Sequence, residues 1–561
     1  MTSKKLRSEF LKFFEKKGHQ IVPSSSLLPT DPSVLFTTAG MQQFKEYFLG
    51  KKSPYGNKVA SCQKCFRTSD IETVGDESHL TFLEMLGNFS FGSYFKEEAI
   101  KLAYEFLFKE LKLPLADVIF TVFEGDKEVP VDKDSILIWK KLGILENKIK
   151  KCGRAENFWG PTGAEGPCGP TTEIHINGIE IWNLVFNEYY QDRNKKLTPL
   201  KQKGVDTGMG LERLAMIVQK KPSVFETDLF LPITAEIPGQ NEKAKRIIAD
   251  HTKSSVFLAT EGVFPANVEQ GYVLRRILRR AIRYGKLLTQ PSGALRAGFL
   301  IPLAKEVIGV YQDVYPDLRS KEADILTVIQ KEEEKFSKTL ARGLKQFEKI
   351  ASLGDIAGID AFHLFDTYGF PLEVTEELAR EKGLKIDKRG FEEAFKKHRD
   401  ISRAGKEKKF GGVGKGVGVE SAKLHTATHL LHSALRKVLG SHVKQMGSDI
   451  TVSRLRFDFS HPQKMTEVEI KKVETLVNQK IKDDLEVKKT EMSLDDALKS
   501  GALAFFKEKY PKKVSVYSIN NFSKEICAGP HIKKTGELGR FKIVKEESPG
   551  AGVRRIRAIL K

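Results

Sequence analysis

Four side chains near the carboxyl-terminal end of the sequence have the types and spacing of metal ligands. His425 and His429 stand four residues apart in Leu424–Leu435, where apolar residues recur at helical spacing. Residues i and i+4 lie on one face of a helix, so both imidazoles can face one ion. Cys527 and His531 stand four apart in Cys-Ala-Gly-Pro-His. Each pair alone is weak, since a surface histidine pair is a common alternative, but together they match the ligands of tetrahedral zinc.

A second segment with chemical potential is Val205-Asp-Thr-Gly-Met-Gly-Leu-Glu-Arg213, which runs into an expected helix. Its glycines permit close approach of the backbone to a ligand, and an arginine at a helix start can meet phosphate oxygens. The pattern is neither a P-loop nor a Rossmann fingerprint, because Gly-Lys-Ser/Thr and the preceding βαβ context are missing. By itself it only suggests phosphate binding.

Length and composition set the frame in which these residues must be positioned. A chain of 561 residues exceeds the roughly 250–300 residues at which single cores stop growing, so several domains are expected. The net charge of +20 (93 basic minus 73 acidic) favours a polyanionic partner, although a generally lysine-rich protein would give the same charge. No apolar run is long enough to favour a membrane. Five cysteines and the absence of a signal-peptide core predict a cytoplasmic protein.

The first 235 residues predict strands and helices that could hold a nucleotide. Residues 8–17 read as an amphipathic helix and Val34–Gly40 as a buried strand. Val59–Arg67 and Leu80–Gly92 read as two strands joined by a polar loop. These two strands predict a hairpin with a nucleotide against its face.

Residues 236–404 read as helical, and residues 405–420 as a glycine- and lysine-rich linker. The helix Gly271–Gly285 carries five arginines beside an apolar stripe, which predicts a basic ridge along one side of a packed helix. A solvated charged face is the common alternative. The absence of an acid within the helix favours contact with RNA. From residue 421 helix and strand alternate, which predicts an α+β domain.

Three sequence motifs within residues 1–235 are similar to those of a known protein family. They are Leu83-Glu-Met-Leu-Gly-Asn-Phe-Ser-Phe-Gly, Gly166-Pro-Cys-Gly-Pro and Asp206-Thr-Gly-Met-Gly-Leu-Glu-Arg. They resemble the class II catalytic domain of alanyl-tRNA synthetases over residues 1–235. The histidine and cysteine motifs resemble the zinc site of the editing domain of that family, whose usual cysteine motif is Cys-Gly-Gly-Thr-His.

The resemblance implies a multidomain α+β protein. Residues 1–235 would be a class II antiparallel sheet with flanking helices, and 236–404 a helical domain that recognises the tRNA acceptor stem. Residues 421–561 would be a zinc-containing editing domain. The implied activity joins L-alanine to tRNA(Ala) with ATP and Mg²⁺ and hydrolyses mischarged Ser- or Gly-tRNA(Ala). With all four ligands on zinc, the ion would orient groups rather than generate hydroxide, unless one ligand leaves the ion.

The resemblance also implies residue roles. Arg67 would meet the α-phosphate of ATP and Arg213 the γ-phosphate. Asp206 would face the ammonium group of alanine. Further ATP contacts would come from His79, Trp159, Ile181, Trp182, Asn183 and Gly210, with Asn183 also at alanine. The family's His-His pair is here His79-Leu80, so one ATP contact is missing or replaced.

For RNA, the resemblance makes Asn267 and Asp366 candidates for base contacts, and a helix cap or a turn carboxylate is the alternative for each. The basic helix adds Arg275, Arg276, Arg279 and Arg280. Gln445 occupies the family's position for a glutamine that contacts the editing substrate, with an exposed loop amide as its alternative.

Two other functions stay open. A trans-editing hydrolase with an inactive synthetase half would be favoured by loss of Arg67, Asp206 or Arg213, but all three are present. A non-catalytic RNA-binding regulator has only Leu80 in its support. Family members commonly continue past the position of Lys561 into a domain that aids tRNA binding and dimerisation, so we expect a monomer.

Overall fold

The structure, a computed structural model, describes most of the chain. The described residues are 1–31, 33–288, 298–398, 419–451, 453–503, 513–527, 529–550 and 552–561. The chain forms two compact units, the first of residues 1–356 and 363–386 and the second of residues 357–362 and 387–561. The expected linker lies outside the described residues, except that residues 419–420 begin a helix. Within the described part of the chain, no helix is long and apolar enough to cross a membrane.

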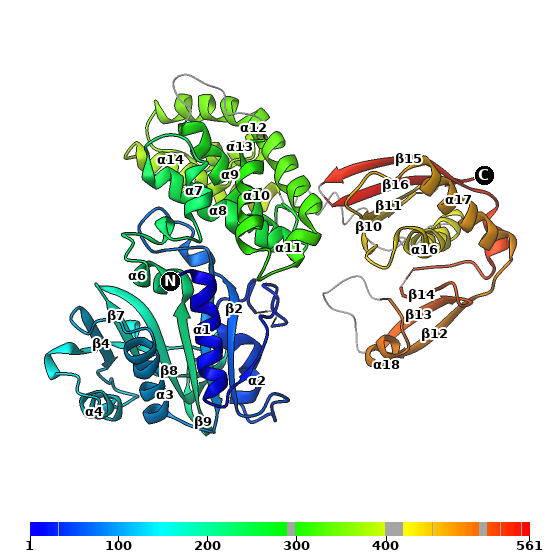
Figure 1. The fold of residues 1–561 in the computed structure, drawn as a ribbon. Coiled ribbons are helices and arrows are strands. Elements are labelled where there is room, and N and C mark those ends of the chain that lie inside the picture. The colour runs from blue at the N-terminus through cyan, green and yellow to red at the C-terminus, as the bar shows by residue number, and fades with distance from the viewer. Residues whose placement is uncertain are drawn as a thin grey trace. The chain divides into compact units, whose positions relative to one another are not determined.

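A nine-stranded sheet organises the first unit (Figure 1). Its order is β1 (Gln20–Ile21), β2 (Lys58–Phe66), β3 (Phe82–Phe91), β9 (Leu197–Gly210), β8 (Ile179–Gln191), β7 (Gly166–Ile176), β4 (Val118–Phe123) and β5 (Ile149–Cys152), with β6 (Phe158–Trp159) paired to β7. The expected antiparallel sheet is correct only for its interior. The two edge pairs, β1 with β2 and β4 with β5, are parallel, so the sheet is mixed.

The hairpin predicted from the sequence is confirmed, because β2 and β3 pair antiparallel along their whole length. The strand expected at Val34–Gly40 is wrong. That segment is irregular and leads into the 3-10 helix Gly40–Phe44. The Thr37 backbone bonds singly to Leu27 and Phe66 instead of joining a ladder. Of its apolar residues, Phe36 and Ala39 are buried but Leu35 is exposed, so the segment lacks the burial of a core strand.

Strand alternation decides which side chains face the helices below the sheet. The helix α1 (Ser3–Lys16) has a phenylalanine-rich buried face, and Trp182 of β8 packs on Phe10 and Phe14. Neighbouring odd-numbered residues of β8 point to the other face. This second face of the sheet is the one that carries a cavity.

Helices cover the end of the sheet in this unit (Figure 1). They are α6 (Leu211–Val218), α7 (Leu231–Ala235), α8 (Glu242–Thr260), α9 (Glu269–Leu288), α10 (Leu300–Tyr311), α11 (Asp317–Ser320), α12 (Glu322–Ala351) and α14 (Leu372–Glu381), together with residues 363–368 of α13 (Gly358–Tyr368). The helix α8 packs on both α9 and β3, so it is buried on nearly all sides. It therefore places polar side chains, among them Asp250 and His251, inside the unit.

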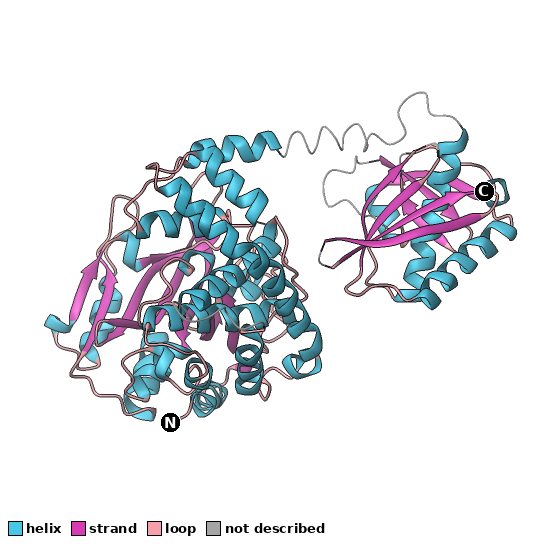
Figure 2. Cartoon of the chain, turned by 90° about the horizontal axis from the view of Figure 1, so that it is seen from above, coloured by secondary structure: helices cyan, strands magenta, loops and turns pink. Residues whose placement is uncertain are grey.

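The second unit has a four-stranded antiparallel sheet in the order β10 (Gln445–Ile450), β11 (Leu455–Ser460), β16 (Val553–Leu560) and β15 (Phe541–Gly550). The helices α16 (Val419–Leu439) and α17 (Glu467–Lys482) bury its apolar face (Figure 2). A smaller sheet contains β12 (Val487–Ser493), β13 (Lys513–Ile519) and β14 (Ser523–Ile526), beside the helix α18 (Leu494–Lys499). The strand β14 contacts α16 and so brings residue 527 to that helix.

Candidate active site and candidate metal centre

A cavity of about 260 Å³ opens on the face of the large sheet opposite α1. Strands β3, β8 and β9, the β2–β3 loop and the start of α6 form its walls. Seven of the residues assigned to ATP or alanine line it: Arg67, Trp159, Ile181, Asn183, Asp206, Gly210 and Arg213. The fold thus gathers side chains from positions 67 to 213 around one space.

Two of the expected ATP contacts do not line this cavity. His79 turns to the Asp76 carboxylate, 2.5 Å from its Nδ1, and Leu80 occupies the wall instead. Trp182 is fully buried on the opposite face of β8. Side chains alternate between the two faces of a strand, so Trp182 faces away from Ile181 and Asn183. This alternation could have excluded Trp182 from the cavity lining on the sequence alone.

The Asp206 carboxylate is the most unusual group of the cavity. It is 4% exposed, and no described side chain donates a hydrogen bond or forms an ion pair to it. Burial alone raises its pKa from 3.8 to about 8. The Asn183 side chain also lines the cavity, and its buried Oδ1 has no hydrogen-bond partner within the described chain. A cation with N–H donors would satisfy both groups.

The two arginines at the cavity are held mainly by acceptors of their own chain. Arg213 opens α6 and donates to the backbone oxygen of Glu180 at 3.0 Å and to its carboxylate at 3.2 Å. Arg67 donates from Nε to the Thr38 carbonyl at 3.2 Å. Each guanidinium has five donors, so both keep N–H groups for an anion.

Acidic residues that the sequence did not single out also line the cavity. Glu173 accepts a hydrogen bond from Asn183 Nδ2 at 3.0 Å, and burial is the main cause that raises its pKa. Glu180 lies near it at Arg213. Carboxylates beside phosphate oxygens are the ligands that Mg²⁺ prefers. Glu173 is the cross-strand partner of Asn183, so the register of β7 and β8 would have revealed it.

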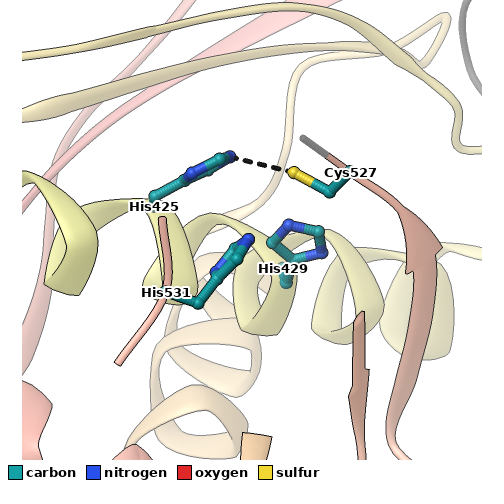
Figure 3. A group of neighbouring side chains, drawn as sticks. All are labelled: His425, His429, Cys527 and His531. Carbon is teal, nitrogen blue, oxygen red and sulfur yellow. Dashed lines mark hydrogen bonds between the residues drawn. The ribbon is translucent and has the colours of Figure 1, made fainter. Parts of the chain in front are cut away.

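The four predicted metal ligands come together in the second unit. The ligand atoms of His425, His429, Cys527 and His531 all lie within 4.8 Å of one another. Figure 3 shows the side chains pointing toward a common centre, two from α16 and two from the segment after β14. The Cys527 sulfur lies 3.3 Å from His425 Nε2. A Cβ at Gly529 would come within 2.0 Å of the His425 ring, so the turn needs a glycine there.

The protonation states of Cys527 and His531 fit a metal, whereas His429 must release a proton to bind one. Burial alone would raise the pKa of the Cys527 thiol, but hydrogen bonds from His425, His429 and His531 outweigh it and lower the pKa to about 3. Burial lowers the pKa of His531 to about 4, which keeps its imidazole neutral. A thiolate and neutral imidazoles are the ligand forms that zinc binds. The donor set therefore fits Zn²⁺.

A buried carboxylate that the sequence analysis missed supports this cluster. Glu525 is 3% exposed and lies 2.9 Å from His429 Nδ1 and 2.9 Å from His432 Nδ1. Burial opposes ionisation of this pair, yet their attraction raises the pKa of His429 to about 10 and lowers that of Glu525. Such a carboxylate fixes the orientation of a metal-binding imidazole. Its place two residues before Cys527, on the same face of the chain, is the signal that could have found it.

Comparison with known proteins identifies the family. The family model described as tRNA synthetases class II (A) matches residues 5–445, and Threonyl and Alanyl tRNA synthetase second additional domain matches residues 514–557. The chain is 49% identical to Alanine–tRNA ligase of Borrelia hermsii, over 99% of each chain, and 47% identical to that of Treponema pallidum, over 99% of this chain and 98% of the relative. For Dehalococcoides mccartyi the identity is 38%, over 100% of this chain and 80% of the relative.

The chain belongs to the alanyl-tRNA synthetases. It therefore has the class II synthetase fold and is an aminoacyl-tRNA ligase, as the sequence resemblance predicted. The alternative with an inactive synthetase half is not favoured, since the relatives match over nearly the whole chain.

The basic ridge predicted for α9 of this alanyl-tRNA synthetase is not open to RNA along its whole length. Arg279, Arg280 and Arg283 are 2–5% exposed and ion-paired. Their partners are Glu332 of α12 and Glu377 of α14. The expectation failed because the acids come from other helices, which a count within α9 could not detect.

The remaining RNA candidates are placed as follows. Arg275 donates to the Asn267 side chain, and Arg276 pairs with Glu72 at 2.5 Å. Asp366 is exposed on α13. Gln445 begins β10 and donates to Ser448 Oγ at 3.1 Å, and it is not one of the four clustered ligands. Their contacts with RNA or with an editing substrate stay predictions.

Proposed function

We propose that the chain joins L-alanine to tRNA(Ala) in two steps at the cavity of the first unit. The alanine carboxylate attacks the α-phosphorus of ATP and pyrophosphate leaves. The terminal ribose hydroxyl of the tRNA then attacks the alanyl-adenylate. One observation carries this proposal: two arginines and a buried carboxylate that has no partner among the described residues line one small cavity.

The residues act by position and charge, and no general base is needed. Asp206 and Asn183 hold the ammonium group. Arg67 neutralises the α-phosphate and Arg213 the γ-phosphate, for which Arg213 must exchange its contact with Glu180. Glu173 and Glu180 would hold Mg²⁺ with the phosphate oxygens, and the ion would neutralise charge on the leaving pyrophosphate.

The second unit is proposed to correct errors that such a pocket makes. A cavity sized for alanine excludes larger amino acids, but it rejects glycine or serine by only about 1–3 kcal/mol. We propose that the second unit hydrolyses Ser- or Gly-tRNA(Ala), with Gln445 at the substrate. His425, His429, Cys527 and His531 would hold Zn²⁺. With four protein ligands the ion has no open position for water, so it would order the site.

On the RNA side, Asn267, Asp366, Arg275 and Arg276 are proposed to contact the acceptor stem. The expectation of a monomer stays a prediction. These proposals concern binding and do not affect the two chemical steps.

Alanine-dependent exchange of pyrophosphate into ATP tests the first activity without tRNA. We expect pyrophosphate exchange with alanine, weaker exchange with serine and glycine, and loss of exchange in Asp206→Asn. Deacylation of Ser-tRNA(Ala) tests the second activity, with Cys527→Ala as the variant. An absence of pyrophosphate exchange in the first assay, together with deacylation in the second, would reject the ligase and favour a trans-editing hydrolase.

A further inference from the structure

The loop that joins β2 to β3, residues 67–81, forms one wall of the nucleotide cavity. Its two ends carry the lining residues Arg67, Asp70, Ser78 and Leu80. Regular structure in the loop is limited to the single 3-10 turn Thr68–Asp70. The position of the Arg67 guanidinium therefore depends on its own hydrogen bond to Thr38 and on what holds the rest of the loop.

Two helices behind the loop hold it at four points. Arg280 of α9 donates to the Ile71 carbonyl at 2.7 Å. Asp250 of α8 accepts hydrogen bonds from the Thr81 amide at 2.9 Å and from its hydroxyl at 2.5 Å. Two further contacts lie at the surface. Arg246 donates hydrogen bonds to Gly75 and Glu77, and Arg276 donates one to Glu72. The buried contacts at Ile71 and Thr81 stand next to the cavity-lining residues Asp70 and Leu80.

Arg280 connects the contacts at Ile71 and Thr81 into one hydrogen-bond network. Its NH2 donates to Glu377 of α14 at 2.8 Å, and its NH1 lies 3.0 Å from His251 Nε2. His251 Nδ1 in turn lies 2.8 Å from Asp250, which holds Thr81. The Arg280 side chain is 2% exposed, so its guanidinium is not accessible to RNA. Its rigid fork instead bridges α8, α14 and the loop, which a lysine ammonium cannot do at once.

We propose that Arg280 is a positioning residue for nucleotide binding: it fixes the Ile71 carbonyl and thereby the loop that presents Arg67 to the cavity. The assignment rests on the proposed role of Arg67 at the phosphates. Arg280 acts through the loop and touches no substrate itself.

Arg283 offers a matched control on the same helix. It is 5% exposed and donates to Glu377 Oε2 at 2.9 Å, but it has no contact with residues 67–81 in the described structure. After either Arg280→Met or Arg283→Met, Glu377 keeps the other arginine and the Tyr284 hydroxyl at 2.7 Å. Arg283→Met also removes an ion pair with Glu381, so it costs at least as many ion pairs as Arg280→Met, but only Arg280→Met releases the loop.

The test uses the full chain and two readouts. Arg280→Met should raise the KM for ATP in alanine-dependent pyrophosphate exchange by about tenfold, the worth of one charged hydrogen bond, while Arg283→Met should change it less than about twofold. Amide hydrogen exchange of residues 71–78 should speed up in Arg280→Met alone. A merely structural role would lower the melting temperature and the active fraction of both variants and leave KM unchanged.

If Arg280→Met does not fold, Arg280→Lys and Arg283→Lys replace the pair, since lysine keeps the charge beside Glu377 but cannot also reach Ile71. The proposal is overturned if both members of the folded pair change KM and loop exchange alike, or if neither does. Wild-type protein without alanine-dependent exchange would reject the proposed function. The amide exchange of the loop would still decide the positioning role.

Discussion

Replacing Asp206 with asparagine tests the alanine site, because the same carboxylate should stabilise the substrate and destabilise the free protein. Burial raises its pKa from 3.8 to about 8. Below pH 4 the group is protonated in both the folded and the unfolded chain. As the pH rises toward 8, only the unfolded chain releases the proton, so the folded state loses stability relative to a chain with a neutral residue.

The magnitude follows from the two pKa values. They differ by about four pH units, and each unit corresponds to about 1.4 kcal/mol, which gives a cost on the order of 5 kcal/mol at pH 8. Asp206→Asn should remove this cost and become more stable than the wild type as the pH rises from 4 to 8. The same change should lower alanine activation by about 30-fold or more, the 2–5 kcal/mol expected when one member of a buried charged pair is removed.

Urea unfolding followed by tryptophan fluorescence is the assay. All three tryptophans, Trp139, Trp159 and Trp182, belong to the first unit, so the signal reports the unit that contains Asp206. In parallel, the KM for alanine of the wild type should rise about tenfold per pH unit below 8, because alanine needs the ionised carboxylate. Parallel stability curves for the two proteins from pH 5 to 8 would refute the reasoning.

Further predictions concern the metal cluster and the phosphate contacts. Cys527→Ala should lose bound zinc, measured by elemental analysis of the purified protein, and an unchanged zinc content would reject the ligand set. Glu525→Gln should keep zinc but weaken its affinity about 10–100-fold in a chelator competition, since the orienting partner of His429 is lost. An unaltered affinity would show that Glu525 does not support the metal. Arg213→Ala should raise the KM for ATP by at least about tenfold in pyrophosphate exchange, as expected for lost charged hydrogen bonds, with little change in the KM for alanine. Equal effects on both substrates would contradict a phosphate role.

Features set by local spacing were predictable from the sequence. Helix and strand alternate from residue 421 as expected, and the start of the helix α17 is fixed by a Thr466–Glu469 capping box. The four ligands of the candidate metal centre also followed from spacing, because His425 and His429 share a helix face and the cysteine motif is short. In both cases the decisive contacts are within a few residues or between two compact motifs.

Features set by distant partners were not predictable. Arg279 meets Glu332, 53 residues away, and Arg280 meets Glu377, 97 residues away, so their burial is invisible in the helix sequence. The misplacement of Trp182 is of another kind. Alternation along β8 places Trp182 on the face opposite Ile181 and Asn183, whereas the family resemblance implied that all three lie at the nucleotide.

A crystal structure with a non-hydrolysable alanyl-adenylate analogue tests the central claim most directly. We expect the Asp206 carboxylate and the ammonium group within hydrogen-bond distance, about 3 Å, and the Arg67 guanidinium at the oxygens that replace the α-phosphate. An analogue bound with its ammonium group away from Asp206, or with Arg67 turned out of the cavity, would contradict it.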